Sequence, residues 1–130
     1  HELEQIKYLA DINDIRYSNA EGFSNFHKVE YWYRLSRIKD QLDYDRQIII
    51  ENYEKVLELR NITLESEGNT TIASSYYPAM SALQIGLIYE ESGNFLLAGV
   101  YFRKCLSMSA FDYQRGIHQK AKAGLERVSN

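Results

Sequence analysis

Residues 82–106 read ALQIGLIYEESGNFLLAGVYFRKCL, and this stretch decides the fold. Two sets of apolar and small residues recur in it at the spacing of one helix face. The first set is Ala82, Ile85, Gly86 and Tyr89, and the second is Ala98, Tyr101, Phe102 and Cys105. Gly93 and Asn94 interrupt the pattern between the two sets. The stretch therefore predicts two short helices that form an antiparallel hairpin.

Small and large residues have different packing roles in this hairpin. Gly86 and Ala98 stand where the two helices must come close, while Tyr89 and Phe102 are large enough to fill the space between them. A single hairpin cannot bury its apolar face alone, so it needs neighbouring helices. The pattern indicates a stacked-helix scaffold and not a catalytic pocket.

Composition excludes several classes of protein. The chain has 130 residues, of which 45% are hydrophobic and 25% charged, as in an ordinary single globular domain. Its net charge of −3 gives no whole-chain reason to expect nucleic acid or an anionic membrane as a partner. No apolar run approaches the roughly 20 residues of a membrane span. We expect a soluble chain.

The compartment stays open at this point. Cys105 is the single cysteine, which excludes an internal disulfide but fits the cytoplasm and a bacterial cell envelope equally. The sequence begins at His1 and not at Met, which fits a processed product, a tag remnant or an excised fragment.

Apolar periodicity and turn residues divide the chain into five predicted parts within one helical domain. These are an N-terminal helix and turn over 1–22, a hairpin over 24–59, a polar connector over 60–76, the hairpin over 77–108 and a last helix over 112–129. Asp112 is the predicted cap of the last helix, and Tyr113 belongs to its predicted buried face. Gly116 and Gly124 predict a close approach to the preceding helix.

The two predicted hairpins are copies of one layout. Superposing 32–57 on 82–106, with one extra residue at the turn, aligns most of the apolar positions. Trp32 falls on Ala82, Leu35 on Ile85, Ser36 on Gly86, Lys39 on Tyr89, Ile49 on Ala98, Tyr53 on Phe102 and Val56 on Cys105. The first copy is the degenerate one.

At these positions the chain resembles the tetratricopeptide repeat (TPR) family. The second hairpin carries the family's residues at Ile85-Gly86, Tyr89, Gly93, Ala98 and Phe102, and Cys105 replaces the final alanine. The resemblance implies an all-α fold of TPR-like antiparallel hairpins, stacked as a short α-solenoid with a C-terminal capping helix. Over 30–128 the chain also looks like the C-terminal segment of larger TPR proteins, some of them from Bacteroidetes.

No residue constellation for catalysis, metal or cofactor binding stands out. His1, His27 and His118 are far apart and lack ligand spacing. Glu90 and Glu91 are neighbours on a helix, so their side chains point about 100° apart and do not converge. Cys105 lies on an apolar face, where it acts as a small core residue. We expect no enzyme activity and no cofactor.

The resemblance implies a binding surface lined by the first helix of each hairpin. The residues that face it would be Glu30, Tyr33, Arg37, Asp40 and Gln41 in the first hairpin, and Met80, Leu83, Leu87, Glu90 and Glu91 in the second. Separately, Tyr31, Tyr33, Tyr76 and Tyr77 are less clearly internal and are expected on a contact surface, where tyrosine is favoured.

We therefore predict a non-enzymatic module that binds a protein or peptide, with no nucleic acid and no membrane span. One alternative is a terminal cap or self-associating unit of a longer TPR protein, in which 1–22 or 60–75 fills the groove. Another is a helical domain that binds a small ligand between its helices.

Overall fold

The computed structural model describes residues 25–67 and 71–129, and this part of the chain is helical without strands. The helices are α2 (Asn25–Gln41), α3 (Arg46–Glu67), α4 (Thr71–Ser74), α5 (Tyr77–Glu91), α6 (Phe95–Leu106) and α7 (Gln114–Val128). The predicted all-α class is confirmed. The helix expected over 1–22 lies outside the described residues.

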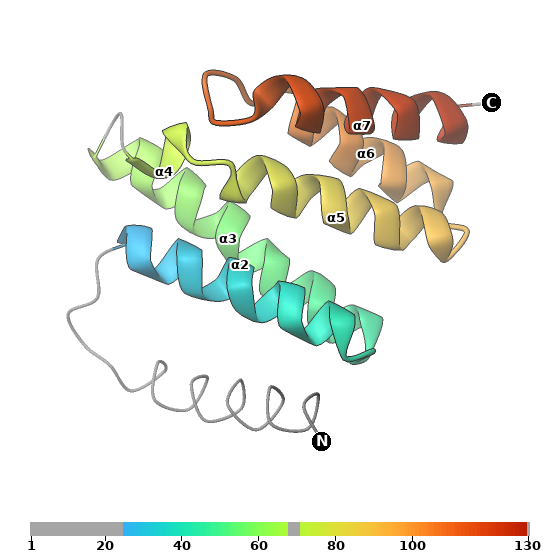
Figure 1. The fold of residues 1–130 in the computed structure, drawn as a ribbon, viewed down its shortest axis with the longest axis horizontal. Helices are drawn as coiled ribbons and strands as arrows, with labels where there is room; N and C mark the ends of the chain where they lie inside the picture. Colours follow the sequence, from blue (N-terminus) through green and yellow to red (C-terminus); the bar gives the residue numbers. More distant parts are fainter. Residues whose placement is uncertain (1–24, 68–70, 130) are drawn as a thin grey trace.

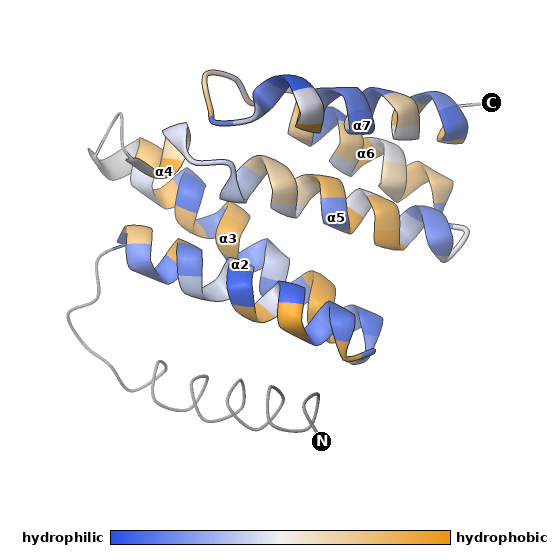
Figure 2. Ribbon diagram, viewed as in Figure 1, coloured by the Kyte–Doolittle hydropathy of each residue, from blue (hydrophilic) through white to orange (hydrophobic). Residues whose placement is uncertain are grey.

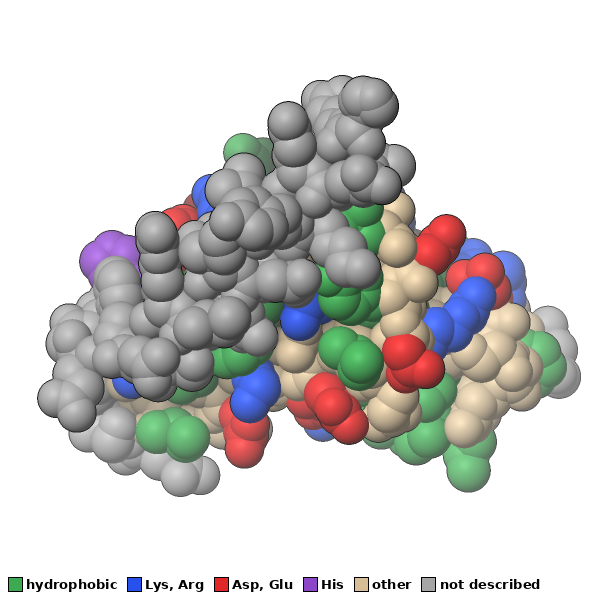
Figure 3. Space-filling view, turned by 90° about the horizontal axis from the view of Figure 1, so that it is seen from below, with side chains coloured by type: hydrophobic (Ala, Val, Ile, Leu, Met, Phe, Trp, Pro, Cys, Tyr) green, Lys and Arg blue, Asp and Glu red, His purple; other side chains and the backbone are tan. Residues whose placement is uncertain are grey.

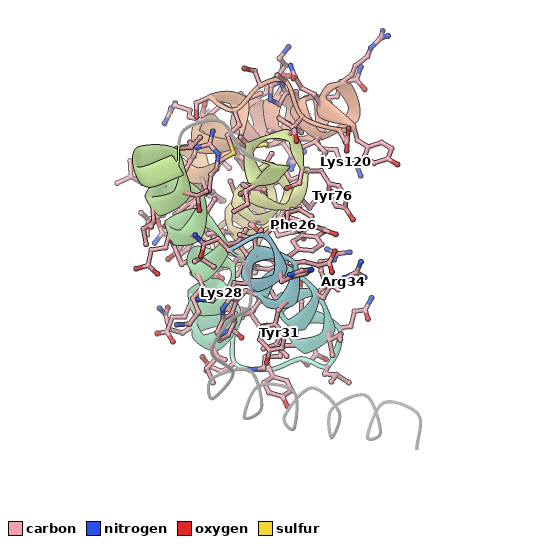
Figure 4. The ribbon with its side chains drawn as sticks, turned by 90° about the vertical axis from the view of Figure 1, so that its left-hand side faces the viewer. Phe26, Lys28, Tyr31, Arg34, Tyr76 and Lys120 are labelled. Atoms are coloured by element: carbon pink, nitrogen blue, oxygen red, sulfur yellow. The ribbon has the colours of Figure 1, made fainter. Side chains whose placement is uncertain are left out.

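The helices form two layers. Helices α2, α5 and α7 lie side by side in one layer, and α3 and α6 lie behind them (Figures 1 and 4). Helix α2 packs against α3 and α5 packs against α6, while α3 also contacts α5 and so joins the two hairpins. Helix α7 packs on both α5 and α6. This is the predicted stack of hairpins with a last helix that covers its end.

The ring of Phe102 lies between two helices that carry glycine. A Cβ added to Gly86 of α5 would stand 2.6 Å from this ring, and one added to Gly124 of α7 would stand 2.5 Å from it. Phe102 itself has no exposed surface. The predicted close approach at Gly124 is confirmed, but at Gly116 it is wrong, because a Cβ there meets nothing within 4 Å.

The first hairpin has different residues at the positions of Gly86 and Phe102. Ser36, at the position of Gly86, is fully buried and donates its hydroxyl to the carbonyl of Trp32 at 2.6 Å. Tyr53, at the position of Phe102, is also fully buried, and its ring centroid lies 6.3 Å from that of Tyr33. A satisfied serine thus replaces the glycine, which explains why the degenerate copy still folds as a hairpin.

The expected polar connector over 60–76 differs from the structure. Helix α3 continues to Glu67, and α4 follows over Thr71–Ser74. Thr63 is 1% exposed and donates to the carbonyl of Leu59 at 2.6 Å, while Ile72 joins the hydrophobic core. Polar composition suggested a loop, but these two burials anchor helical backbone against its neighbours.

The start of α7 also differs from expectation. Asp112 is exposed, and the cap position is taken by Tyr113, whose φ is +63° and whose side chain makes no capping bond. Tyr113, expected in the core, is 76% exposed. His118 holds the preceding turn instead, because its ring nitrogen lies 2.9 Å from the carbonyl oxygen of Met108.

The amphipathic pattern of α7 fits a capping helix. Ile117 and Ala121 are buried, as predicted, and Leu125 and Val128 pack partly against the core. Figure 2 shows α7 hydrophilic along much of its length, in contrast to the more apolar α5. Among the helices of the described ranges, none is both long and apolar enough to cross a membrane.

The glycine contacts predict opposite effects for two alanine substitutions in α7. Gly124→Ala should lower the free energy of unfolding by about 2 kcal/mol, because its methyl group overlaps the Phe102 ring. Gly116→Ala should raise it by about 0.5–1 kcal/mol, because its methyl group meets open space and alanine favours helix. Urea unfolding of both variants measures this difference. Equal effects would contradict the packing described for Phe102.

Candidate interaction surface

The predicted surface residues fall into three groups in the structure. Gln41 and Glu91 are exposed, Glu30, Arg37, Asp40, Met80, Leu87 and Glu90 are half-buried, and Tyr33 and Leu83 are buried. Leu83 has no exposed surface and belongs to the hydrophobic core, so it supports α5 from within and does not line a surface. Tyr33 is 7% exposed, beneath its aromatic neighbours.

Glu90 and Glu91 diverge, as predicted, and each forms an ion pair with a different helix. Glu90 accepts two hydrogen bonds from Arg127 of α7, at 2.6 and 2.8 Å. Glu91 accepts one from Arg46 at the start of α3, at 2.9 Å. The C-terminal end of α5 is thus tied to its neighbours in both layers.

These contacts affect the charge that the surface presents. The hydrogen bond from Arg127 holds the pKa of Glu90 below its ordinary value. Burial raises the pKa of Asp40, although nearby Arg37 opposes this shift. Acidic and basic side chains also lie beside one another on the face shown in Figure 3. Most of the charge at this end of α5 is therefore compensated within the chain.

A row of aromatic rings crosses the other end of the same layer. We call Phe26, Tyr33, Tyr76, Tyr77 and Tyr113 the aromatic ladder. The centroid of Tyr77 lies 6.2 Å from Phe26, 4.9 Å from Tyr33 and 4.7 Å from Tyr76, and Tyr76 lies 5.8 Å from Tyr113. The ladder joins α2, the start of α5 and the turn before α7.

Exposure increases along the aromatic ladder from Tyr33 and Tyr77 to Tyr113. Tyr33 and Tyr77 are each 7% exposed, Tyr76 is half-buried, and Tyr113 is 76% exposed. Burial raises the pKa of Tyr33 to about 12, so its hydroxyl stays protonated in ordinary buffers. Two buried rings therefore support two rings that a partner can reach.

Polar groups border the aromatic ladder on α2. The hydroxyl of Tyr77 donates to Glu30 at 2.9 Å, and the guanidinium of Arg34 lies 3.7 Å from the same carboxylate. The Arg34 side chain is 66% exposed, so it keeps donors that point to solvent. Figure 4 places Arg34, Tyr76 and Lys120 on the same side of the molecule.

Arg37 lies one turn further along α2, near buried hydroxyls. Burial by itself lowers the pKa of its guanidinium, but the neighbouring Tyr53 and Tyr33 together outweigh this effect and the pKa is raised. Within the described ranges the buried Tyr53 hydroxyl forms no hydrogen bond. Arg37 is half-buried and Arg34 is exposed, so Arg34 is the arginine that a partner reaches more easily.

Sequence analysis missed three of these residues. Arg34 carries a readable signal, since it follows Glu30 by four positions on one helix face. Lys120 is one of several cations near the end of the sequence, and its spacing gives no signal of a contact surface. Tyr113 carries no such signal, because its exposure depends on the left-handed backbone before α7. Tyr76 and Tyr77 were both expected on a contact surface. Both belong to the aromatic ladder, but only Tyr76 reaches the surface.

The thiol of Cys105 and clusters of metal-ligating residues are the remaining candidates for chemistry. Cys105 has no exposed surface, and burial raises the pKa of its thiol to about 11, which disfavours the nucleophilic thiolate. This confirms its role as a core residue. In the part of the chain that the structure describes, no three His, Cys, Asp or Glu residues gather as metal ligands.

Residues 81–112 match a family model described as tetratricopeptide repeat. The match covers the second hairpin and relates this segment to a repeat family that is not catalytic and typically mediates protein interactions. No curated protein and no solved structure matches the chain.

The Glu90–Arg127 pair predicts a pH dependence of stability. The folded-state pKa of Glu90 is lowered, so the pair stabilises the fold above the ordinary glutamate pKa of about 4.3 and this stabilisation is lost as the pH falls further. At pH 7 the free energy of unfolding of the wild type should exceed that of Glu90→Gln by about 0.5 kcal/mol. The value is small because the Arg127 side chain is 51% exposed. The difference should shrink as the pH falls below about 4.3 and the Glu90 carboxylate takes up a proton.

Urea unfolding at several pH values measures this difference. Glu126→Gln serves as the control, because Glu126 is an exposed carboxylate on the same helix as Arg127. A stability difference for Glu90→Gln that stays constant from pH 7 to pH 3 would rule out the ion pair as its cause.

Proposed function

We propose that the chain is a non-enzymatic protein–protein interaction module, which binds a peptide or helix on the layer formed by α2, α5 and α7. The aromatic ladder is the observation that carries this proposal. Its ring Tyr76 packs on the buried Tyr77 and against the exposed Tyr113, and Tyr76 lies on the side of the molecule where Arg34 and Lys120 stand.

Rigid aromatic side chains are effective contact residues. Tyrosine offers a large contact area and loses little conformational entropy on binding, and tyrosine and arginine are enriched among residues that dominate binding energy. Tyr76 already contacts Tyr77 and Tyr113, so its ring is held in place before any partner arrives. This preorganisation favours binding, because a partner need not order the ring.

Helix α5 supplies the floor of the surface beyond the aromatic ladder. Met80 and Leu87 are half-buried on it, and Gln84 donates its amide to the sulfur of Met80 at 3.5 Å. The 15 residues of α5 span about 22 Å, which equals about six or seven residues of an extended peptide. The ion pairs of Glu90 and Glu91 mark the far end.

Peptide selection tests this proposal. Peptides enriched on the wild-type protein from a displayed random library should bind Tyr76→Ala, Tyr113→Ala and Arg34→Gln about tenfold more weakly, as expected for anchor residues. Fluorescence anisotropy measures the affinities. Tyr113 and Arg34 are exposed, so their variants should fold as the wild type does, which circular dichroism checks.

Lys122→Gln is the matched control for Arg34→Gln, since Lys122 is an exposed cation on α7. Unchanged affinity in Tyr76→Ala, Tyr113→Ala and Arg34→Gln, or an equal loss of affinity in the control, would refute binding at this surface.

A further inference from the structure

The outer faces of α3 and α6 carry unusual exposed apolar residues. Phe95, Leu96 and Val100 of α6 are 55%, 80% and 40% exposed, and Ile48 and Ile62 of α3 are 42% and 52% exposed. Leu96 and Val100 are four residues apart and so share one face of α6. Neither helix belongs to the layer that holds the aromatic ladder (Figure 1).

Charged residues of opposite sign continue these two faces. On α6 the exposed face continues with Arg103 and Lys104. On α3 the exposed Glu51, Lys55 and Glu58 lie between Ile48 and Ile62. The ammonium of Lys55 lies over the Trp32 ring, 4.8 Å from its centroid, and the two carboxylates leave the face with a net negative charge. The wider sequence has the same asymmetry. Residues 103–130 contain six Lys and Arg against two Asp and Glu, whereas residues 1–102 contain nine against sixteen. The outer face of α6 is thus apolar and basic, and that of α3 is apolar with a net negative charge.

A depression adjoins the exposed residues of α6. It has a volume of about 340 Å³ and is lined by Phe95, Leu96, Gly99, Arg103, Val128 and Ser129. Gly99 contributes no side chain, and the guanidinium of Arg103 would lie only 3.4 Å from a Cβ at that position. The depression therefore combines apolar walls with a cation at its edge, which suits an aliphatic side chain that is followed by a carboxylate.

We propose that this face binds a second copy of the chain, with α3 of one copy against α6 of the other. Helix α3 presents exposed isoleucine next to exposed glutamate, whereas α6 presents apolar side chains and cations but no carboxylate. Both helices occur in every copy, so each contact forms twice around a two-fold axis.

The direction of the helices allows this symmetry. Helices α3 and α6 run in the same direction (Figure 1), so a two-fold axis parallel to them brings each onto the other in the partner copy. The internal repeat places Gln47 at the level of Leu96, and Glu51 at the level of Val100. Ile48 of the partner copy then meets Leu96, and Arg103 lies between the levels of the partner's Glu51 and the partner's Glu58.

The expected dimer is weak and depends on salt. Stable interfaces bury about 800 Å² and involve about 20–30 residues on each partner, whereas the faces of α3 and α6 offer five exposed large apolar side chains. Association should therefore occur at micromolar concentrations, and added salt should weaken it by screening the charge pairs. This surface and the aromatic ladder lie in different layers, so the proposal does not rest on peptide binding.

Sedimentation equilibrium tests the proposal. The weight-average mass should rise from 15.2 kDa toward twice that value as the protein concentration increases from about 5 to 500 µM. The double variant Arg103→Glu/Lys104→Glu and the double variant Glu51→Lys/Glu58→Lys should each dissociate at least about tenfold more readily. An equimolar mixture of the two variants should associate again, because the reversed charges match.

The control is Arg115→Glu/Lys122→Glu, which makes the same change of charge at exposed positions of α7 and should leave the dimer intact. A wild-type chain that stays at 15.2 kDa throughout would overturn the proposal. A dimer that is equally stable in the charge-reversal variants, or a mixture of the two variants that does not reassociate, would place any association on another surface. Either result would also overturn the proposal.

Discussion

The contact of the Phe102 ring with two glycines is the constraint on which the rest of the structure depends. The ring of α6 fills the space that Gly86 of α5 and Gly124 of α7 leave open, where a Cβ would come within 2.5–2.6 Å of it. Three helices therefore approach one another at a single ring. This contact fixes α7 against the second hairpin, and it allows Arg127 to reach Glu90 across the layer.

The position of α7 in turn determines the proposed binding surface. The turn before α7 carries Tyr113, whose ring meets Tyr76 only because α7 packs where it does. The opposite end of the layer is occupied by the ion pairs of Glu90 and Glu91. One end of the surface is therefore aromatic with exposed cations, and the other is closed by charges that already have partners. This difference gives a bound peptide a preferred place.

Helical periodicity and the repeat pattern were enough to predict the all-α fold, both hairpins and the capping helix. They succeed because Gly86, Ala98 and Phe102 have spacing that only close helix packing explains. The polar composition of 60–76 predicted a connector where the chain is largely helical, since the burial of Thr63 and Ile72 depends on distant helices. The surface was harder to predict. Leu83 was expected on the surface and is buried, whereas Tyr113 was expected in the core and is exposed. Both positions depend on the local backbone geometry, which the spacing of apolar residues does not reveal.

A chemical-shift footprint tests the central claim most directly. Amide spectra of the ¹⁵N-labelled chain would be recorded with and without a peptide selected on the wild-type protein. The account predicts that the largest shifts cluster at Arg34, Tyr76 and Tyr113, with further shifts along α5. Shifts confined to the outer faces of α3 and α6, with none at Tyr76 or Tyr113, would contradict it.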